Sequence, residues 1–199
     1  VSDKLSKFFP GFPRGDEVTL HHLLSHTSGI HSYTDTPGFI KGVTSPVKAA
    51  VLVETITKEP YDFEPGQRFK YSNSGYFLLG LIVEKASGKP YGEYLREKFF
   101  KPLGMKNTGM HRRGFEPAGE ALGYTRSGKG YKRAVDWDMS WAGGAGALYS
   151  TARDLGLWNE GLFAFKVLER KSLDLAFTPN KLLEDRESTR LNSSHSAIS

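Results

Sequence analysis

The sequence predicts a mostly helical fold with one edge of a sheet, on three observations. Most segments with a clear pattern show helical periodicity or helix caps, and few alternate polar and apolar residues as strands do. Hydrophobic residues make up 38% and aromatic residues 13% of the 199 positions, which is enough apolar material for a packed core. No apolar run approaches the roughly 20 residues that span a bilayer, so we expect no transmembrane segment.

Two helices are predicted in the first third of the chain. Thr19 suits the N-cap of a short helix that stops at residues 28–29, a Ser-Gly pair. Ser45 before Pro46 is typical of an N-cap followed by proline at the first helical position. We therefore expect a second helix that runs from there toward Lys58.

The strongest helix prediction covers residues 74–87. Its apolar residues form one stripe at helical spacing, and Gly88 stands where a C′ glycine ends a helix. Further helices are predicted at residues 91–100, after an N-cap at Ser150, and at residues 171–177. The glycine-rich stretch 104–132 is expected to form short strands and loops.

Charge and composition narrow the function classes. The net charge is +5, from 27 Lys+Arg and 22 Asp+Glu, but the basic residues are scattered among acidic ones. This pattern is typical of a solvated mixed surface, so no nucleic-acid partner is expected. The absence of cysteine excludes disulfides, thiolate metal sites and a cysteine nucleophile.

The end of the chain differs in character from the rest. Residues 187–199 are rich in serine, hold few large apolar residues and show no periodicity. They resemble translated adapter sequence more than evolved protein. We therefore expect a single domain over residues 1–186 and a tail at residues 187–199 that is disordered or artefactual.

The segment Tyr71-Ser72-Asn73 directly precedes the strongest predicted helix. A helix N-terminus presents free N–H groups and the positive end of the helix dipole. A tyrosine there can act as a general base if nearby cations lower its pKa, and an asparagine can bind an amide or ester. The structural alternative is that Asn73 or Ser74 caps the helix and Tyr71 packs beneath it.

His22 and His26 stand four residues apart, a spacing at which two side chains on one helix face can bind zinc. The zinc-protease motif needs a glutamate directly after the first histidine, and here that residue is Leu23. We therefore expect no metal site. The simpler interpretation is that His26 hydrogen-bonds the loop that ends the helix.

Ser45 and Lys48 form the single Ser-x-x-Lys pattern of the chain. At a helix start this spacing places the ammonium one turn above the hydroxyl, where an amine can take the proton of a serine nucleophile. The alternative is a plain N-cap with Lys48 in solvent.

The segment 142–147 consists of alanines and glycines. Its glycines allow either close approach of the backbone to a ligand or tight packing between two elements. The chain has no phosphate-binding loop and no dinucleotide-binding glycine pattern.

Four ordered blocks of the sequence resemble the serine β-lactamase-related family. That family includes class C β-lactamases, D-alanyl-D-alanine carboxypeptidases and β-lactamase-fold esterases. The blocks are residues 18–30 (VTLHHLLSHTSGI), 63–80 around Tyr-Ser-Asn, 102–108 (PLGMKNT) and 144–155 (GAGALYSTARDL). Four blocks in one order make the resemblance specific, whereas Tyr-Ser-Asn alone would be weak.

The resemblance implies an α+β fold of the β-lactamase/penicillin-binding-protein (DD-peptidase) type. This chain would cover mainly the helical domain and lack the terminal sheet strands. The implied chemistry is acyl transfer, in which the serine of a Ser-x-x-Lys motif attacks a lactam, peptide or ester carbonyl. Tyr71 would be the catalytic tyrosine, and Asn73 the substrate-orienting amide.

The resemblance also implies the surroundings of the site. The substrate-binding positions near the cleft would be His31, Tyr33, Gly144 and Gly146. The substrate would be a small molecule or a peptidoglycan-like peptide. The mechanism needs no metal and no organic cofactor.

The sequence departs from the family pattern at the nucleophile. In the family Ser-x-x-Lys precedes the His-Thr-Ser-Gly segment, whereas Ser45 and Lys48 follow it, so we treat them as a decoy. No Lys/His-x-Gly motif follows the fourth block. We expect a fragment of a serine hydrolase that is inactive alone. The alternatives are a non-catalytic penicillin-recognising binding or regulatory homologue, and a hydrolase built on Ser45 and Lys48.

Overall fold

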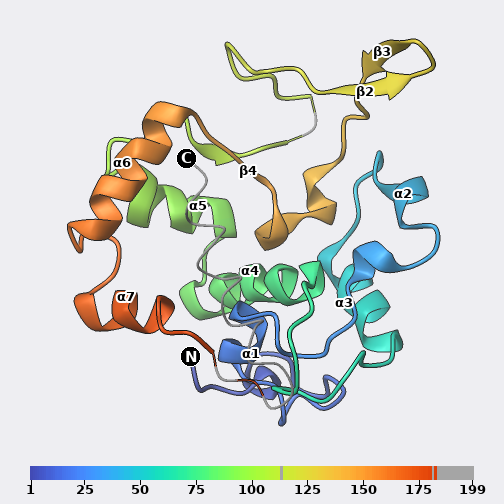
Figure 1. Cartoon of the computed structure of the whole chain (residues 1–199), viewed down its shortest axis with the longest axis vertical. Coiled ribbons are helices and arrows are strands. Elements are labelled where there is room, and N and C mark those ends of the chain that lie inside the picture. Colours follow the sequence, from blue (N-terminus) through green and yellow to red (C-terminus); the bar gives the residue numbers. More distant parts are fainter. Residues whose placement is uncertain (113, 181, 183–199) are drawn as a thin grey trace.

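The computed structural model describes residues 1–112, 114–180 and 182, and Figure 1 shows how its elements are arranged. Its helices are η1 (Leu5–Lys7), α1 (Leu20–Leu24), η2 (Tyr33–Asp35), α2 (Phe39–Gly42), α3 (Ala49–Lys58), α4 (Asn73–Ser87), α5 (Tyr91–Leu95), η3 (Arg96–Phe100), η4 (Met139–Trp141), η5 (Gly143–Ala145), α6 (Ala152–Phe163) and α7 (Arg170–Ala176). Its strands are β1 (Gly109–Met110), β2 (Tyr124–Ser127), β3 (Gly130–Arg133) and β4 (Leu148–Tyr149). Helices therefore predominate, as predicted. Across the described residues, no helix has both the length and the apolar character needed to span a membrane.

Within the described residues the strands form two separate antiparallel pairs instead of the single sheet edge that was predicted. β1 pairs with β4, with Gly109 opposite Tyr149. β2 and β3 form a hairpin with Tyr124 opposite Arg133, and all of its strand residues are exposed. Figure 1 shows this hairpin projecting away from the helical body. The short strands expected in the glycine-rich stretch are therefore present.

Helix α4 occupies the centre of the fold because it contacts both α1 and η5. Close contact is possible at two glycines. At Gly75 an added Cβ would lie 3.4 Å from the carbonyl oxygen of Leu23 on α1. At Gly80 it would lie 2.9 Å from the backbone of Gly144 in η5, closer than real Cβ atoms approach. Gly88, with φ +69°, ends the helix in the left-handed conformation, as predicted.

One hydrophobic cluster joins α1, α3 and α4 to the N-terminal segment. Its buried members are Leu5, Phe12, Val18, Leu23, Ile30, Tyr33, Leu52, Ile56, Phe77, Leu78 and Ile82. Because full burial of one such side chain contributes about 1.5–3 kcal/mol, this cluster is the main stabilising contribution to the fold.

The predicted start of the second helix is wrong. α3 begins at Ala49, with Lys48 as its N-cap in an extended conformation, so Ser45 is not a cap. The carbonyl oxygen of Ser45 instead accepts a hydrogen bond from Trp141 Nε1 at 2.7 Å. The residues before α3 are therefore held by η4 in a non-helical conformation.

The first helix is also shorter than predicted. α1 ends at Leu24, and His26 adopts the left-handed conformation with φ +56°, which stops the helix before Ser28.

The last predicted helix, α7, agrees with the structure to within one residue at each end. The predicted tail at residues 187–199 lies outside the described residues.

Asp154 of α6 is buried, with 2% of its surface exposed, and it joins two segments of the chain. Its Oδ2 accepts hydrogen bonds from the Asn107 N–H at 2.7 Å and from Thr108 Oγ1 at 2.8 Å. Its own N–H donates to the hydroxyl of Thr151, so the N-cap of α6 is Thr151 and not Ser150 as predicted. This carboxylate therefore attaches the segment before β1 to α6.

We expect Asp154→Ala to lower the free energy of unfolding by about 2–3 kcal/mol, because it leaves two donors without their charged acceptor. Urea denaturation measures this loss. Arg153→Ala, at an exposed neighbour, is the matched control and should stay within about 0.5 kcal/mol of the parent. Equal losses in the two variants would contradict the structural role of the carboxylate.

Candidate functional site

Two segments that are distant in sequence meet at the N-terminus of α4. The backbone hydrogen bonds that join them run from Gly66 N–H to Thr27 O at 2.7 Å, from Asp62 N–H to Gly29 O at 2.7 Å, and from Lys70 N–H to His26 O at 3.0 Å. The approach is closest at Gly29, where φ is +74° and an added Cβ would lie 2.0 Å from the Phe63 carbonyl oxygen. Only glycine fits this position, because any side chain would collide with backbone.

Tyr71 lies at the surface of this junction, with 57% of its area exposed. Its hydroxyl donates to Asn73 Oδ1 at 3.0 Å. The structural alternative for this segment is therefore wrong: Tyr71 does not pack beneath α4, and the N-cap is Ser72 and not Asn73 or Ser74. The phenol and the carboxamide that the sequence singles out are in direct contact.

Asn73 is held by two hydroxyl groups from the 31–34 segment. Its Nδ2 donates to Thr34 Oγ1 at 3.0 Å, and its backbone N–H donates to Ser32 Oγ at 3.1 Å. The two hydroxyls contact each other at 2.9 Å. An amide side chain has two N–H donors and two acceptor lone pairs, so the Thr34 and Tyr71 bonds use half of its capacity. The remaining half can bind a substrate amide or ester.

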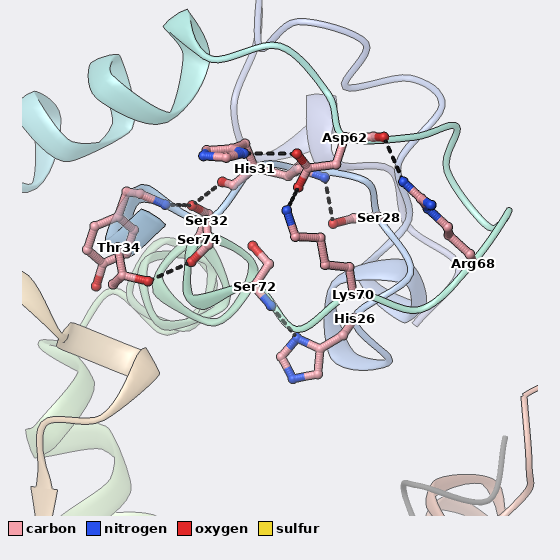
Figure 2. A network of polar contacts seen from close by, with 12 residues as sticks. His26, Ser28, His31, Ser32, Thr34, Asp62, Arg68, Lys70, Ser72 and Ser74 are labelled. Carbon is pink, nitrogen blue, oxygen red and sulfur yellow. Dashed lines mark hydrogen bonds and ion pairs between the residues drawn. The ribbon is translucent and has the colours of Figure 1, made fainter. Parts of the chain in front are cut away.

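His31, Asp62 and Lys70 form a charged group on the other side of the junction, as Figure 2 shows. Asp62 Oδ1 lies 2.9 Å from His31 Nδ1, and its Oδ2 lies 2.7 Å from Lys70 Nζ. Partial burial alone would raise the pKa of Asp62, but the hydrogen bonds from His31 and Lys70 hold that pKa below its usual value. Asp62 therefore stays ionised and fixes the Lys70 ammonium and the His31 imidazole.

Ser74 connects His31 to α4. Its hydroxyl donates to the His31 carbonyl oxygen at 2.6 Å and accepts from the Tyr33 N–H at 2.9 Å. The Tyr33 ring itself is buried, with 3% exposed, and its hydroxyl donates to the carbonyl oxygen of Trp141. Burial raises the pKa of Tyr33 well above its usual range. The Tyr33 side chain is therefore a core residue, which corrects its assignment as a substrate-binding group.

The glycines near η5 act as packing positions in the structure. An added Cβ at Gly144 would lie 2.6 Å from the Tyr76 carbonyl oxygen and 2.8 Å from Gly80. Gly146 is in extended backbone, with φ 173°. The packing alternative therefore accounts for Gly144, and η5 meets α4 at this point.

Neither the Ser45–Lys48 pair nor the His22–His26 pair forms a site within the described residues. Ser45 and Lys48 are both exposed and precede α3, so the hydroxyl and the ammonium are not stacked on one helix turn. His22 Nδ1 accepts a hydrogen bond from the Thr19 N–H at 3.3 Å and completes a capping box of α1. The described part of the chain contains no cluster of three or more metal-ligating side chains.

Residues of α4, α5, β1 and η4 are among those that line a cavity of about 1240 Å³. Its lining includes Glu84, Tyr91, Met110, His111, Gly143 and Tyr149. Tyr71, Asn73 and His31 do not line it, so the candidate site is the surface junction and not this cavity.

Sequence reasoning missed the polar residues that hold the site. Ser32 and Thr34 alternate directly after the His-Thr-Ser-Gly-Ile segment, and Asp62 stands between an aromatic pair. The available signal was a pair of hydroxyl residues, Ser32 and Thr34, because such side chains commonly hydrogen-bond backbone groups at turns and helix ends. Their partners on α4 could not be read from local sequence.

Comparisons with a family model, with a curated relative and with solved structures agree with one another. The family model described as "Beta-lactamase" matches residues 1–192. "Putative penicillin-binding protein PbpX" of Bacillus subtilis (strain 168) is 33% identical over 179 residues, which are 90% of this chain and 44% of that protein.

Two solved structures share the fold. The D-stereospecific amidohydrolase of Streptomyces sp. superposes with a TM-score of 0.81 at 28% identity, over 94% of this chain and 59% of that one. The D-amino acid amidase of Ochrobactrum anthropi SV3, in its complex with D-phenylalanine, gives a TM-score of 0.76 at 29% identity, over 86% of this chain and 52% of that one. The predicted α+β fold of the β-lactamase and penicillin-binding-protein type is confirmed. The chain spans about half the length of these relatives.

The stability of the protein should fall in mild acid because of two histidines. Burial lowers the pKa of His22 and of His26 below the ordinary value of about 6.5. Below that value the unfolded chain binds protons that the folded chain does not, so the free energy of unfolding decreases as pH falls.

Urea denaturation at pH 7.5 and pH 5.5 measures this effect. We expect His26→Asn and His22→Asn each to lose less stability between the two pH values than the parent does. Each unit by which a folded-state pKa is lowered corresponds to at most about 1.4 kcal/mol. Identical losses in the parent and both variants would exclude these histidines as the cause.

Proposed function

The chain belongs to the Beta-lactamase family, and on that premise we propose that the protein is a serine hydrolase that forms an acyl-enzyme. The substrate class is a lactam, a peptide of D-amino acids, or an ester. Relatives named as a penicillin-binding protein and as hydrolases of D-stereospecific amides support this class. A peptidoglycan-like peptide or a small amide is therefore the substrate to test first.

The contact between Tyr71 and Asn73 is the observation that carries the proposal. The phenol is exposed and hydrogen-bonded to the Asn73 carboxamide, which the Thr34 hydroxyl also holds, while the Ser32 hydroxyl accepts from the Asn73 backbone N–H. A fixed amide can orient a substrate carbonyl or amide, and an exposed phenol can exchange a proton with the reacting group. The pair lies at the N-terminus of the 15-residue helix α4, whose dipole favours negative charge at that end.

In the proposed reaction a serine Oγ attacks the substrate carbonyl carbon and gives its proton to Tyr71, which acts as the catalytic base. The C–N or C–O bond to the leaving group breaks, and the leaving group takes up a proton that Tyr71 delivers. Water then attacks the acyl-serine ester and releases the acid. Asn73 holds the substrate during both steps.

The nucleophile in this proposal comes from a Ser-x-x-Lys segment outside the 199 residues. Ser45 and Lys48 precede α3 and are not placed for proton transfer along a helix turn. The 199-residue chain by itself is therefore proposed to lack turnover.

Covalent labelling with a fluorescent penicillin tests where the nucleophile lies. We expect no adduct on the folded 199-residue chain and an adduct on a serine of the complete gene product, located by mass spectrometry. An adduct on Ser45 would overturn the assignment of the motifs. Reversible binding of penicillin by the complete product, with no adduct, would support a penicillin-recognising binding protein instead.

Tyr71→Phe tests the acid–base assignment in the complete gene product. We expect it to slow acyl-enzyme formation by about 10²–10⁴-fold, the usual scale for removal of a general base. Tyr94→Phe removes a phenol hydroxyl on α5 and is the matched control, with an unchanged rate. If Tyr71→Phe acylates as fast as the parent, Tyr71 has no part in the mechanism.

A further inference from the structure

His26 contacts the backbone on both sides of Tyr71. Its carbonyl oxygen accepts the Lys70 N–H at 3.0 Å, and its ring Nδ1 accepts the Ser72 N–H at 3.2 Å. One residue of the first segment therefore holds the peptide groups before and after Tyr71. Figure 2 shows the ring of His26 directed at the Ser72 amide.

The ring of His26 also contacts the Tyr71 side chain itself. The two ring centroids are 4.5 Å apart with an interplanar angle of 35°. The His26 ring is stacked at 4.9 Å on Tyr76 of α4, whose hydroxyl donates to the Leu24 carbonyl oxygen at 3.0 Å. The exposed phenol therefore rests on an imidazole that α4 fixes from another direction.

The backbone of His26 explains how a single residue makes all three contacts. With φ +56° it adopts the left-handed conformation, which is uncommon for residues other than glycine but enriched for histidine and asparagine. This conformation turns the carbonyl and the ring toward the same stretch of chain. The strained conformation is compatible with a functional role, since such residues cluster at functional sites.

We infer that His26 is a positioning residue for Tyr71: its neutral imidazole holds the phenol against Asn73, and its protonation releases that hold. This inference rests on the proposed function, in which Tyr71 performs proton transfer. His26 touches no reacting group in this role and acts through Tyr71 alone.

The protonation state of the His26 imidazole determines whether its Nδ1 can accept the hydrogen bond from the Ser72 N–H. Nδ1 accepts the Ser72 N–H, so in the neutral ring the proton is on Nε2. A proton added at Nδ1 would place two donors face to face and leave the Ser72 N–H unsatisfied. Ser72 is buried, so that loss is costly. The titratable side chains in ring contact with His26 are Tyr71 and Tyr76.

NMR of the 199-residue chain with labelled tyrosine and histidine rings tests the inference without any activity. The Tyr71 signal is the one that disappears in Tyr71→Phe. We expect this signal to shift between pH 8 and pH 5 with the same midpoint as the His26 ring. A Tyr71 signal that does not follow the His26 titration would overturn the inference.

Three variants separate the contacts of His26. Asparagine tolerates the left-handed backbone and keeps an acceptor near Ser72. His26→Asn should therefore keep the Ser72 amide protected from hydrogen exchange but abolish the pH-dependent shift of the Tyr71 signal. His26→Phe keeps a ring but no acceptor, so the Ser72 amide should exchange faster. His22→Asn, four residues earlier, disrupts the capping box and should leave the Tyr71 signal unchanged. Equal shifts of Tyr71 in His22→Asn and His26→Asn would indicate a merely structural effect.

Kinetics of the complete gene product separate this inference from the proposed function. We expect His26→Asn to lower kcat by up to about 10²-fold with a smaller change in KM, the scale of a misplaced reacting group. The acidic limb of the pH profile should also move. If Tyr71→Phe leaves acylation unchanged while the NMR titrations still coincide, the catalytic assignment fails and the contact between His26 and Tyr71 stands. If the variants do not fold, the parent titration alone decides.

Discussion

The close approach of two backbone segments at Gly29 is the constraint on which the site depends. An added Cβ there would lie 2.0 Å from the Phe63 carbonyl oxygen, and three backbone hydrogen bonds join the same two segments. Neither segment is helical over this stretch, so their peptide groups would otherwise be left without partners in a partly buried place. Because Gly29 has no side chain and adopts a left-handed φ, the two segments approach closely enough to hydrogen-bond each other's peptide groups. The positions of Tyr71, Asn73 and Asp62 follow from that pairing.

Helix α4 connects this arrangement to the hydrophobic core. Its first residues accept and donate hydrogen bonds to the 31–34 segment, and its middle packs against η5 through the contact of Gly80 with Gly144. The same helix buries Phe77, Leu78 and Ile82 in the main cluster. A surface site can be held rigidly in this way, because the residues that orient it belong to an element whose other end is fixed by packing.

The sequence was sufficient for α4 and its C-terminal glycine, because helical periodicity and a C′ glycine are local signals. It was insufficient for Ser45, where proline after serine favoured a helix start but a hydrogen bond from Trp141, 96 residues away, holds the backbone otherwise. Tyr33 was misassigned for the same reason. The family resemblance placed it near the cleft, whereas its ring packs between Phe39 and Phe77. The partners that decide these positions are distant in sequence, and no local pattern encodes them.

The distribution of charge around Tyr71 constrains how its proton can move. Lys70 precedes Tyr71 in sequence, but its ammonium lies 2.7 Å from Asp62 and shares that carboxylate with His31. The Asp62 carboxylate therefore keeps the Lys70 ammonium from acting on the phenol. His26, the imidazole in contact with the Tyr71 ring, is kept neutral because burial lowers its pKa. A tyrosine that works as a base needs a cation to favour its anionic form. Within the described residues the neighbouring cation is already committed to Asp62, so the proposed mechanism requires that charge from the lysine of the nucleophile segment.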